Sequence, residues 1–431
     1  MTSTIKVNKI EKESGSTITL GGPSTAITLA CGATQTGFGR TGTVDWCTTA
    51  KTSPLTAVSG KGYFINTTGG VVTVTLPSSP TAGDIVSIKD YANTFDTNPV
   101  TVDRNGSKIS GSCDDGHLST EGDSTTLIYV DGTKGWLNVQ TDDTVIGAYS
   151  LQMVVVAGGG AGGGNDHGGG GGAGGYREST QYVSEGNVLT VAVGGGGAAG
   201  SAPTGWRGNN GDTSQISGTG LTTITSAGGG GGASNGPGGP GAVARNGLPG
   251  GSGGGGAGIS GQPDGVGGTG NTPPVAPPQG KDGGDGDYNG NPKYTTGGGG
   301  GASALGADAS GSNAGNGGAG TASSITGASV TRAGGGGGSG GPGSTNGTGG
   351  AGGGGAGVTN TTVNNGTANT GGGGGGLSNA CSTAGGLGGS GVVILNMPTP
   401  AYSGTTSGCV SSATSGGNTI LTFTGTGTYT T

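Results

Sequence analysis

Residues 151–175 read LQMVVVAGGGAGGGNDHGGGGGAGG: an apolar run, Met153–Ala157, opens directly into a glycine block, and a short polar turn leads to a second block. The region ends in a similar way, because another apolar run, Val392–Leu395, follows the last glycine block. A flexible linker does not need such strands, and unpaired apolar strands beside a disordered tail would promote aggregation. The bracketing therefore predicts that the glycines between the two strands form an ordered structure.

The glycine blocks recur at a regular interval. Successive blocks begin about 36 residues apart, except for one interval of about twice that length. The blocks begin at Gly158, Gly194, Gly228, Gly297, Gly334 and Gly371. Most units contain a second, shorter block, so each unit is predicted to form one outward rod and one returning rod.

Consecutive glycines exclude collagen, which needs glycine at every third position with proline-rich neighbours. They favour the polyproline-II conformation, which has three residues per turn and no internal hydrogen bonds. The amides and carbonyls must then be satisfied by neighbouring rods, which can approach closely because glycine has no side chain. Since ordering glycine is entropically costly, only a cooperative lattice could form. We predict about ten to twelve polyglycine-II rods in residues 151–393.

Two regions precede the glycine-rich one. Residues 1–43 contain short alternating segments such as Thr4–Ile10 and Ser16–Leu20, too few in apolar residues for a core of their own. We expect them to intertwine with other copies of the chain or to attach to a larger assembly. In residues 44–150, β-branched and aromatic runs are separated by Gly, Pro and Asn turns, which predicts a β-sandwich or barrel-like domain. The predicted strands are Tyr63–Ile65, Val71–Leu76, Asp84–Lys89, Pro99–Val102, Thr125–Val130 and Gly135–Val139.

The predicted fold class is therefore all-β with essentially no α-helix. An N-terminal β segment (1–43) and a β-domain (44–150) precede a glycine-rich polyglycine-II domain with C-terminal strands (151–431). A homotrimer is expected, because closed rotational symmetry would bury segments such as Thr4–Ile10 between copies.

The composition excludes several classes of function. The net charge is −7 and the pI is about 4.7. The basic residues form no run, which argues against nucleic-acid binding. Met1–Ile10 lacks the apolar core of a signal peptide, and no apolar stretch is long enough to span a membrane. Five widely spaced cysteines indicate free thiols rather than a disulfide framework.

No arrangement of residues supports catalysis, so we expect the protein not to be an enzyme and to need no cofactor. The two histidines, His117 and His167, have no nucleophile or metal-ligand set at useful spacing. Cys113–His117 is interpreted as a polar β-turn. Asp285-x-Asp287-x-Asn289-Gly290 matches half of an EF-hand loop, but Thr296 occupies the position of the bidentate Glu, so no metal site is predicted.

Five segments carry a resemblance: MTSTIKVNKIEKESGSTITLGG at the start, MVVVAGGGAGGG and GGGGGAGGYR in the first unit, and GGSGVVILNMP with ILTFTGTGTYT at the end. The first is similar to the N-termini of fibre proteins of marine phages, and the others to the glycine-rich adhesin domains of tailed-bacteriophage fibres. The resemblance implies a virion protein made in the host cytoplasm, attached to other tail or fibre proteins through residues 1–43. It also implies that distal loops bind a host-cell receptor, either an outer-membrane protein or a glycan.

The paired rods indicate which loops could bind. If both bracketing strands lie at one end, the turns between outward and returning rods lie at the far end, including Asn165–His167, Ser201–Arg207, Ser303–Ala314, Ser344–Asn346 and Leu377–Ala384. Trp206 and Arg207 have the composition of a binding hot spot, although Trp206 could instead pack a loop onto the lattice edge. Ile259–Thr296 is predicted to be the most loop-like insertion. The candidate receptor-binding residues are Asp166, His167, Trp206, Arg207, Tyr288, Lys293 and Tyr294.

An alternative from another class is a free polyglycine-II structural protein of the ice-binding or extracellular-matrix type. A secretion signal and few insertions would be expected for that class, whereas this chain has no such signal and has long, varied loops. A third possibility, a disordered low-complexity chain, is disfavoured by the regular blocks and their bracketing strands.

Overall fold

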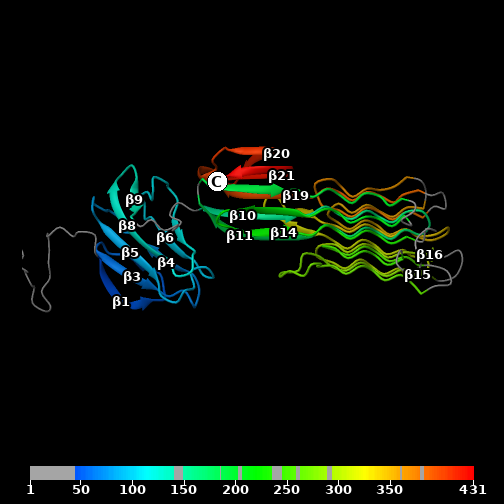
Figure 1. The fold of residues 1–431 in the computed structure, drawn as a ribbon, viewed down its shortest axis with the longest axis horizontal. Helices are drawn as coiled ribbons and strands as arrows, with labels where there is room; N and C mark the ends of the chain where they lie inside the picture. The colour runs from blue at the N-terminus through cyan, green and yellow to red at the C-terminus, as the bar shows by residue number, and fades with distance from the viewer. Residues whose placement is uncertain are drawn as a thin grey trace, which may run out of the picture.

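The computed structural model describes residues 44–139, 149–184, 186–201, 206–234, 245–258, 263–288, 294–359, 362–378 and 383–431. In this part of the chain the only helical element is a single 3-10 turn, η2 (Thr399–Ala401), and the remaining elements are strands. No helix among these residues is long and apolar enough to cross a membrane. A β-domain, a barrel-like sheet and an array of extended rods follow one another along the long axis (Figure 1). The predicted all-β fold class is confirmed.

The β-domain is a sandwich of two sheets. One sheet has the order β1-β3-β5-β8-β9, with β1 (Asp45–Lys51), β3 (Lys61–Ile65), β5 (Ile85–Asp90), β8 (Ser124–Asp131) and β9 (Gly135–Asn138). The other has the order β2-β4-β6-β7, with β2 (Leu55–Thr56), β4 (Val72–Thr75), β6 (Val100–Asp103) and β7 (Gly116–Leu118). The alternating side chains of both sheets enclose one core, which contains the fully buried Phe95 and Trp136.

The connectivity of this domain differs from a simple hairpin arrangement. The first six strands alternate between the two sheets, so β1, β3 and β5 pair in parallel, as do β2, β4 and β6. All six predicted strands are present, whereas β1, β2 and β7 were not predicted. Short alternating strands look the same in sequence whether the chain turns back or crosses to the opposite sheet.

The two bracketing strands of the glycine-rich region pair with each other in the barrel-like sheet. Its order is β11-β10-β19-β21-β12-β13-β14, with β20 also paired to β21. The strands are β10 (Tyr149–Val156), β11 (Tyr176–Val183), β12 (Val188–Ala192), β13 (Ser214–Gly218), β14 (Leu221–Ser226), β19 (Val392–Pro398), β20 (Thr406–Ser415) and β21 (Asn418–Thr430). β10 runs antiparallel to β19, with Val154 opposite Ile394. The glycine-rich region is therefore entered and left at the same end.

The second half of β10, Met153–Val156, is apolar without alternation because both of its faces are buried, whereas Gln152 in the first half is exposed. Met153 and Val155 point into the barrel core. Val154 and Val156 belong to a second cluster, where Ala302 and Ala333 from the base of the rods pack against them. A strand with two buried faces has no position for a polar side chain. This second cluster joins the barrel to the array of rods.

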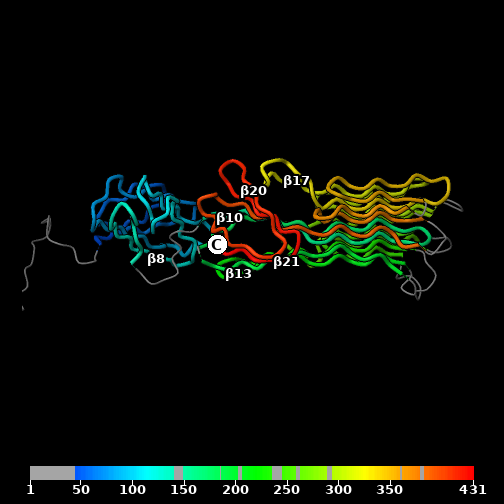
Figure 2. The backbone as a smooth tube through the Cα atoms, turned by 90° about the horizontal axis from the view of Figure 1, so that it is seen from above, coloured from blue at the N-terminus to red at the C-terminus, as the bar shows by residue number. Residues whose placement is uncertain are grey.

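The hydrogen bonds show that the rods have three residues per turn. In the first rod, residues three apart donate their amides to the same neighbour. Gly158, Ala161 and Gly164 donate to Asp212, Asn209 and Trp206; Gly159 and Gly162 donate to Gly389 and Gly386; Gly160 and Gly163 donate to Gly172 and Gly169. Three successive amides thus reach three different neighbours, as expected for a polyproline-II rod in a lattice. Figure 2 shows the rods lying side by side as undulating tubes.

The second rod, residues 168–175, lies at the centre of the lattice. It donates amides to rods 371–377, 227–233 and 297–301, and its carbonyls accept amides from rods 158–164, 252–256 and 333–339. Six rods therefore surround it. A Cβ added at Gly171 would lie 2.2 Å from the carbonyl oxygen of Gly160, so only glycine permits this spacing.

The lattice contains more rods than predicted, because its outer rods are not glycine blocks. In residues 206–212, WRGNNGD, Gly208 and Gly211 face the interior, and a Cβ on either would lie 2.1 Å from a carbonyl oxygen of the first rod. The residues between them face outward and can be polar. An outer rod therefore needs glycine only at every third position, so segments that were not predicted as rods, including 206–212, 263–270 and 279–286, are rods.

Candidate functional site

Of the predicted turns, Asn165–His167 and Ser344–Asn346 lie at the end of the lattice farthest from the barrel (Figure 1). Residues 202–205 of Ser201–Arg207 and residues 379–382 of Leu377–Ala384 lie outside the described residues. Asn165–His167 joins the first two rods there, and Gly341 donates its amide to Tyr294 at the same end. The prediction for Ser303–Ala314 was wrong. Ala302, just before this segment, packs near the barrel, and residues 304–309 form an outward rod, so only the turn around Gly311 is distal. The segment divides because residues 304–309 run outward beside rod 297–301, with their single glycine, Gly306, facing the interior, where an added Cβ would lie 2.1 Å from the carbonyl oxygen of Gly298.

Three predicted site residues form a column of stacked rings at the distal end. The His167 and Tyr294 ring centroids are 4.3 Å apart, and those of Tyr294 and Tyr288 are 5.1 Å apart. His167 belongs to the first turn, whereas the tyrosines come from a hairpin formed by β15 (Asp287–Tyr288) and β16 (Tyr294–Thr295). The structure thus brings together residues more than a hundred positions apart in the sequence. Lys293 lies outside the described residues.

His167 holds the column in place, and Asp166 presents a carboxylate beside it. The His167 side chain is 5% exposed, compared with 41% for Asp166. Its Nδ1 lies 3.2 Å from Ser378 Oγ, and its Nε2 lies 3.1 Å from Asp166 Oδ1. Burial lowers the pKa of His167, and the charge of Asp166 opposes this shift. A neutral, packed ring is a supporting element, so the group available to a ligand here is Asp166.

The backbone at the distal end is strained at Trp206. Its φ is +64°, a left-handed conformation that is a genuine outlier for a bulky side chain. Asn165 and His167 also have positive φ, at +58° and +56°. The carbonyl of Trp206 accepts the amide of Gly164 at 2.8 Å, which fixes the strained residue next to the first turn. Strain of this kind persists where the surroundings enforce it, and it is concentrated at functional sites.

Arg207 has a different role from Trp206. Its Nη2 donates a hydrogen bond to the carbonyl oxygen of Asn246 at 2.6 Å, which joins two outer rods. The side chain is half-buried, and burial lowers its pKa. The sequence grouped the two residues as a hot-spot pair. The structure gives Arg207 a packing contact and leaves Trp206 as the strained aromatic.

Comparison with protein families identifies residues 133–398 as a match to the family described as glycine-rich domain. The chain belongs to this glycine-rich domain family. The match includes β10 to β19 and all the rods, and it ends before β20 and β21. A search of curated proteins gives no significant match.

The interval predicted as the most loop-like insertion of the glycine-rich domain is largely lattice. Asp282 and Asp285 lie three residues apart on rod 279–286 and accept the amides of Gly270 and Gly267, both at 2.7 Å. Asp287 accepts the amide of Gly311 at 2.6 Å. These carboxylates accept hydrogen bonds from backbone amides that have no backbone carbonyl as partner. This role explains why acidic residues occur in a rod. No group of three or more possible metal ligands occurs among the described residues.

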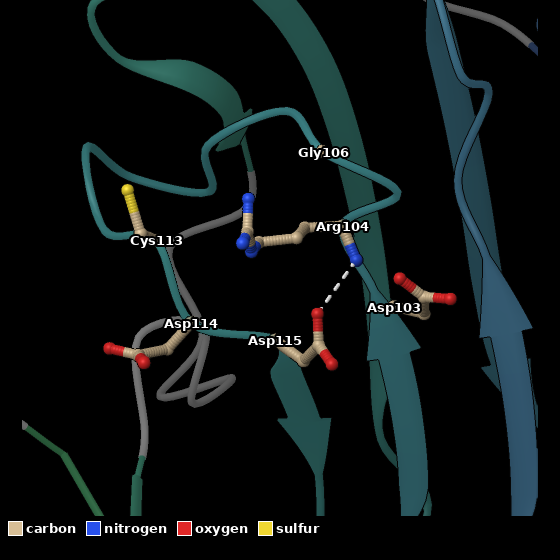
Figure 3. Close-up of a pocket in the computed structure, with 6 residues that line it drawn as sticks. All are labelled: Asp103, Arg104, Gly106, Cys113, Asp114 and Asp115. Atoms are coloured by element: carbon tan, nitrogen blue, oxygen red, sulfur yellow. Dashed lines mark hydrogen bonds between the residues drawn. The ribbon is translucent and has the colours of Figure 1, made fainter. Parts of the chain in front are cut away.

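A second group of polar residues lies in the β-domain, where Asp103, Arg104, Gly106, Cys113, Asp114 and Asp115 line a pocket of about 320 Å³ (Figure 3). Its carboxylates stabilise turns. Asp115 Oδ1 accepts the amide of Arg104 at 3.0 Å, and Asp103 Oδ1 accepts that of Asn105 at 2.8 Å. Asp114 accepts the Ser112 hydroxyl at 2.7 Å. The interpretation of Cys113–His117 as a polar turn fits this geometry for Cys113–Asp115, whereas Gly116 and His117 already pair with β6 in strand β7.

Two further distal residues lie within segments that the sequence predicted as a turn or an insertion, but they were not predicted as site residues. Ser378 contacts His167 across the lattice, and Asp264 accepts the amide of Tyr288 at 2.9 Å. Asp264 directly precedes Gly265, the first glycine of an outer rod. Glycine at every third position could have located Asp264 at a rod end, but its contact with Tyr288 depends on how the rods are arranged.

Proposed function

We propose that this protein is a structural protein of a virion, a bacteriophage tail fibre whose glycine-rich domain presents its distal end to a host-cell receptor. The observation that carries the proposal is the contrast between the two parts of that domain. The rods are built from backbone hydrogen bonds between residues with little or no side chain. The distal end brings together Trp206, Asp166 and the column of His167, Tyr294 and Tyr288.

The shape of the molecule supports this role. A rigid lattice holds its distal turns in place, so binding there costs little additional ordering. Stacked tyrosines together with small polar residues such as Ser310 and Asn313 have the composition of adaptable binding loops with aromatic anchors. At the other end of the chain, the sequence resemblance implies that residues 1–43 attach to other virion proteins.

The direct test is to locate the chain on particles and to block its function. We expect gold-labelled antibody against the full chain to decorate the tail or the surface of a virion in electron micrographs. The purified chain should also compete with intact particles for adsorption to host cells. Unlabelled particles together with no competition would favour the free structural protein of the ice-binding or matrix type.

We also propose a homotrimer. The core of residues 44–139 is intramolecular and needs no partner, so assembly would depend on other surfaces of residues 1–150. Multi-angle light scattering of the purified chain at micromolar concentration should give three times the chain mass of 39.8 kDa. A single monomeric species at that concentration would contradict the trimer while leaving receptor binding open.

A further inference from the structure

The β-domain and the barrel meet through a small contact. The ring of His117, in β7, stacks on Tyr182, in β11, with centroids 4.0 Å apart and planes 28° from parallel. None of the sheets formed by the described residues contains strands of both domains. A small, non-covalent contact of this kind allows relative motion of domains by default.

A polar cleft lies at the same junction. It has a volume of about 560 Å³ and is lined by residues of both domains, including Asp96 and Ser119 from the β-domain and Thr180 and Thr222 from the barrel. The facing surfaces are therefore hollowed at the junction, and the stack of His117 on Tyr182 is a direct contact between the two domains.

His117 is suited to this position only while it is neutral. Its Nδ1 is buried and has no hydrogen-bond partner among the described residues. Burial lowers the pKa of His117, and the charge of Asp115 opposes the shift. The ionisable groups that face the ring are Asp115, from the turn before β7, and the Tyr182 phenol, from β11. On β6, the paired residue Thr101 carries no charge.

We propose that the junction is a pH-operated joint, in which neutral His117 latches the β-domain onto Tyr182 and protonation of its ring releases the latch. The protonated ring would bury an Nδ1–H donor for which the described residues offer no acceptor, and this cost opposes protonation of the docked ring. Release would free the glycine-rich domain to change its angle to the β-domain. This inference does not depend on the proposed function.

The lowered pKa of His117 determines in which direction pH changes the stability of docking. Burial lowers the pKa of His117, and the Tyr182 ring stacked on it at 4.0 Å supplies part of that burial, so the docked state binds protons more weakly than the undocked state. Docking is then fully stable above the ordinary histidine pKa of about 6.5 and weakens as the pH falls through that value. Between pH 7.5 and 5.0 the docking constant should fall by about tenfold for each pH unit below 6.5, until the docked form also titrates.

Small-angle X-ray scattering of the full chain at pH 7.5 and 5.0 tests the joint. We expect the radius of gyration and the maximum dimension to decrease on acidification, because the docked β-domain, barrel and rods lie in line and a released joint lets them bend. His117→Phe keeps a stacked ring that cannot be protonated, so it should keep the parent's pH 7.5 dimensions at both pH values. Tyr182→Ala removes the other ring and should show the smaller dimensions at both. His167→Phe, which alters the only other histidine, should respond as the parent does.

Two outcomes would overturn the joint. One is an acid response in His117→Phe equal to the parent's, because the response would then arise elsewhere. The other is a parent whose dimensions stay constant while NMR shows that His117 titrates fully between the two pH values. Circular dichroism at pH 5.0 separates joint opening, which leaves the strand signal intact, from unfolding.

Discussion

Gly299→Ala should lower the free energy of unfolding by about 3 kcal/mol or more, because the lattice has no room for a methyl group. A Cβ at this position would lie 2.0 Å from the carbonyl oxygen of Gly171, in the central rod. That oxygen accepts the amide of Gly336 at 2.8 Å, so moving it aside breaks an inter-rod hydrogen bond. Gly230→Ala should behave similarly, since its Cβ would lie 1.9 Å from the Leu248 carbonyl oxygen.

Gly195→Ala provides the matched control, because it makes the same change within a rod. The only atom near its added Cβ is a side-chain carboxylate oxygen of Asp212, at 3.3 Å. Ala198, one turn further along the same rod, is exposed and is already alanine. This variant should be neutral or gain about 0.5 kcal/mol, because alanine restricts the unfolded chain. Thermal melts followed by circular dichroism compare the variants, and equal melting temperatures for Gly299→Ala and Gly195→Ala would rule out close packing of rods.

Trp206→Gly should reduce adsorption to host cells by about 30-fold, corresponding to a hot-spot loss of about 2 kcal/mol. At φ +64°, glycine relieves strain that tryptophan must bear. The relief should offset the lost packing of the half-buried ring, so that stability stays within about 1 kcal/mol of the parent. The substitution thus separates the binding role of the ring from its role in folding, which Trp206→Ala cannot do.

Asn369→Gly is the control for this backbone change. Asn369 has φ +60° and lies at the opposite end of the lattice, in the turn before Gly371, which approaches Val156 of β10. It should keep full adsorption. A folded Trp206→Gly variant that adsorbs as well as the parent would place the binding surface elsewhere, with Tyr288 and Tyr294 as the next residues to replace.

The adsorption of an Arg207→Ala variant should be interpreted only together with its melting temperature. The Arg207 guanidinium joins rod 206–212 to Asn246, so reduced adsorption in this variant alone could follow from loosening of the outer rods. A variant in which both Trp206 and Arg207 are replaced by alanine is informative only if its melting temperature equals that of the parent. Trp206→Gly is the cleaner test for that reason.

The sequence alone determined the character of the lattice. Consecutive glycines allow rods to approach within hydrogen-bonding distance, and the two apolar strands had to pair because neither could remain exposed. The strands of the β-domain could likewise be read from residues such as Tyr63–Ile65, because alternation with a period of two follows from strand geometry. The all-β fold class followed from these local patterns.

Only the tertiary structure decided which segments became rods and which residues met at the distal end. Residues 206–212 and 279–286 look like loops, because an outer rod needs glycine only where it faces the interior. Asp282 and Asp285 resemble ligands in sequence, yet they accept amides from the neighbouring rod. The stacking of His167 on Tyr294 depends on the position of each rod in a two-dimensional lattice. Hydrogen bonds between identical glycine backbones carry no side-chain information about which rod pairs with which.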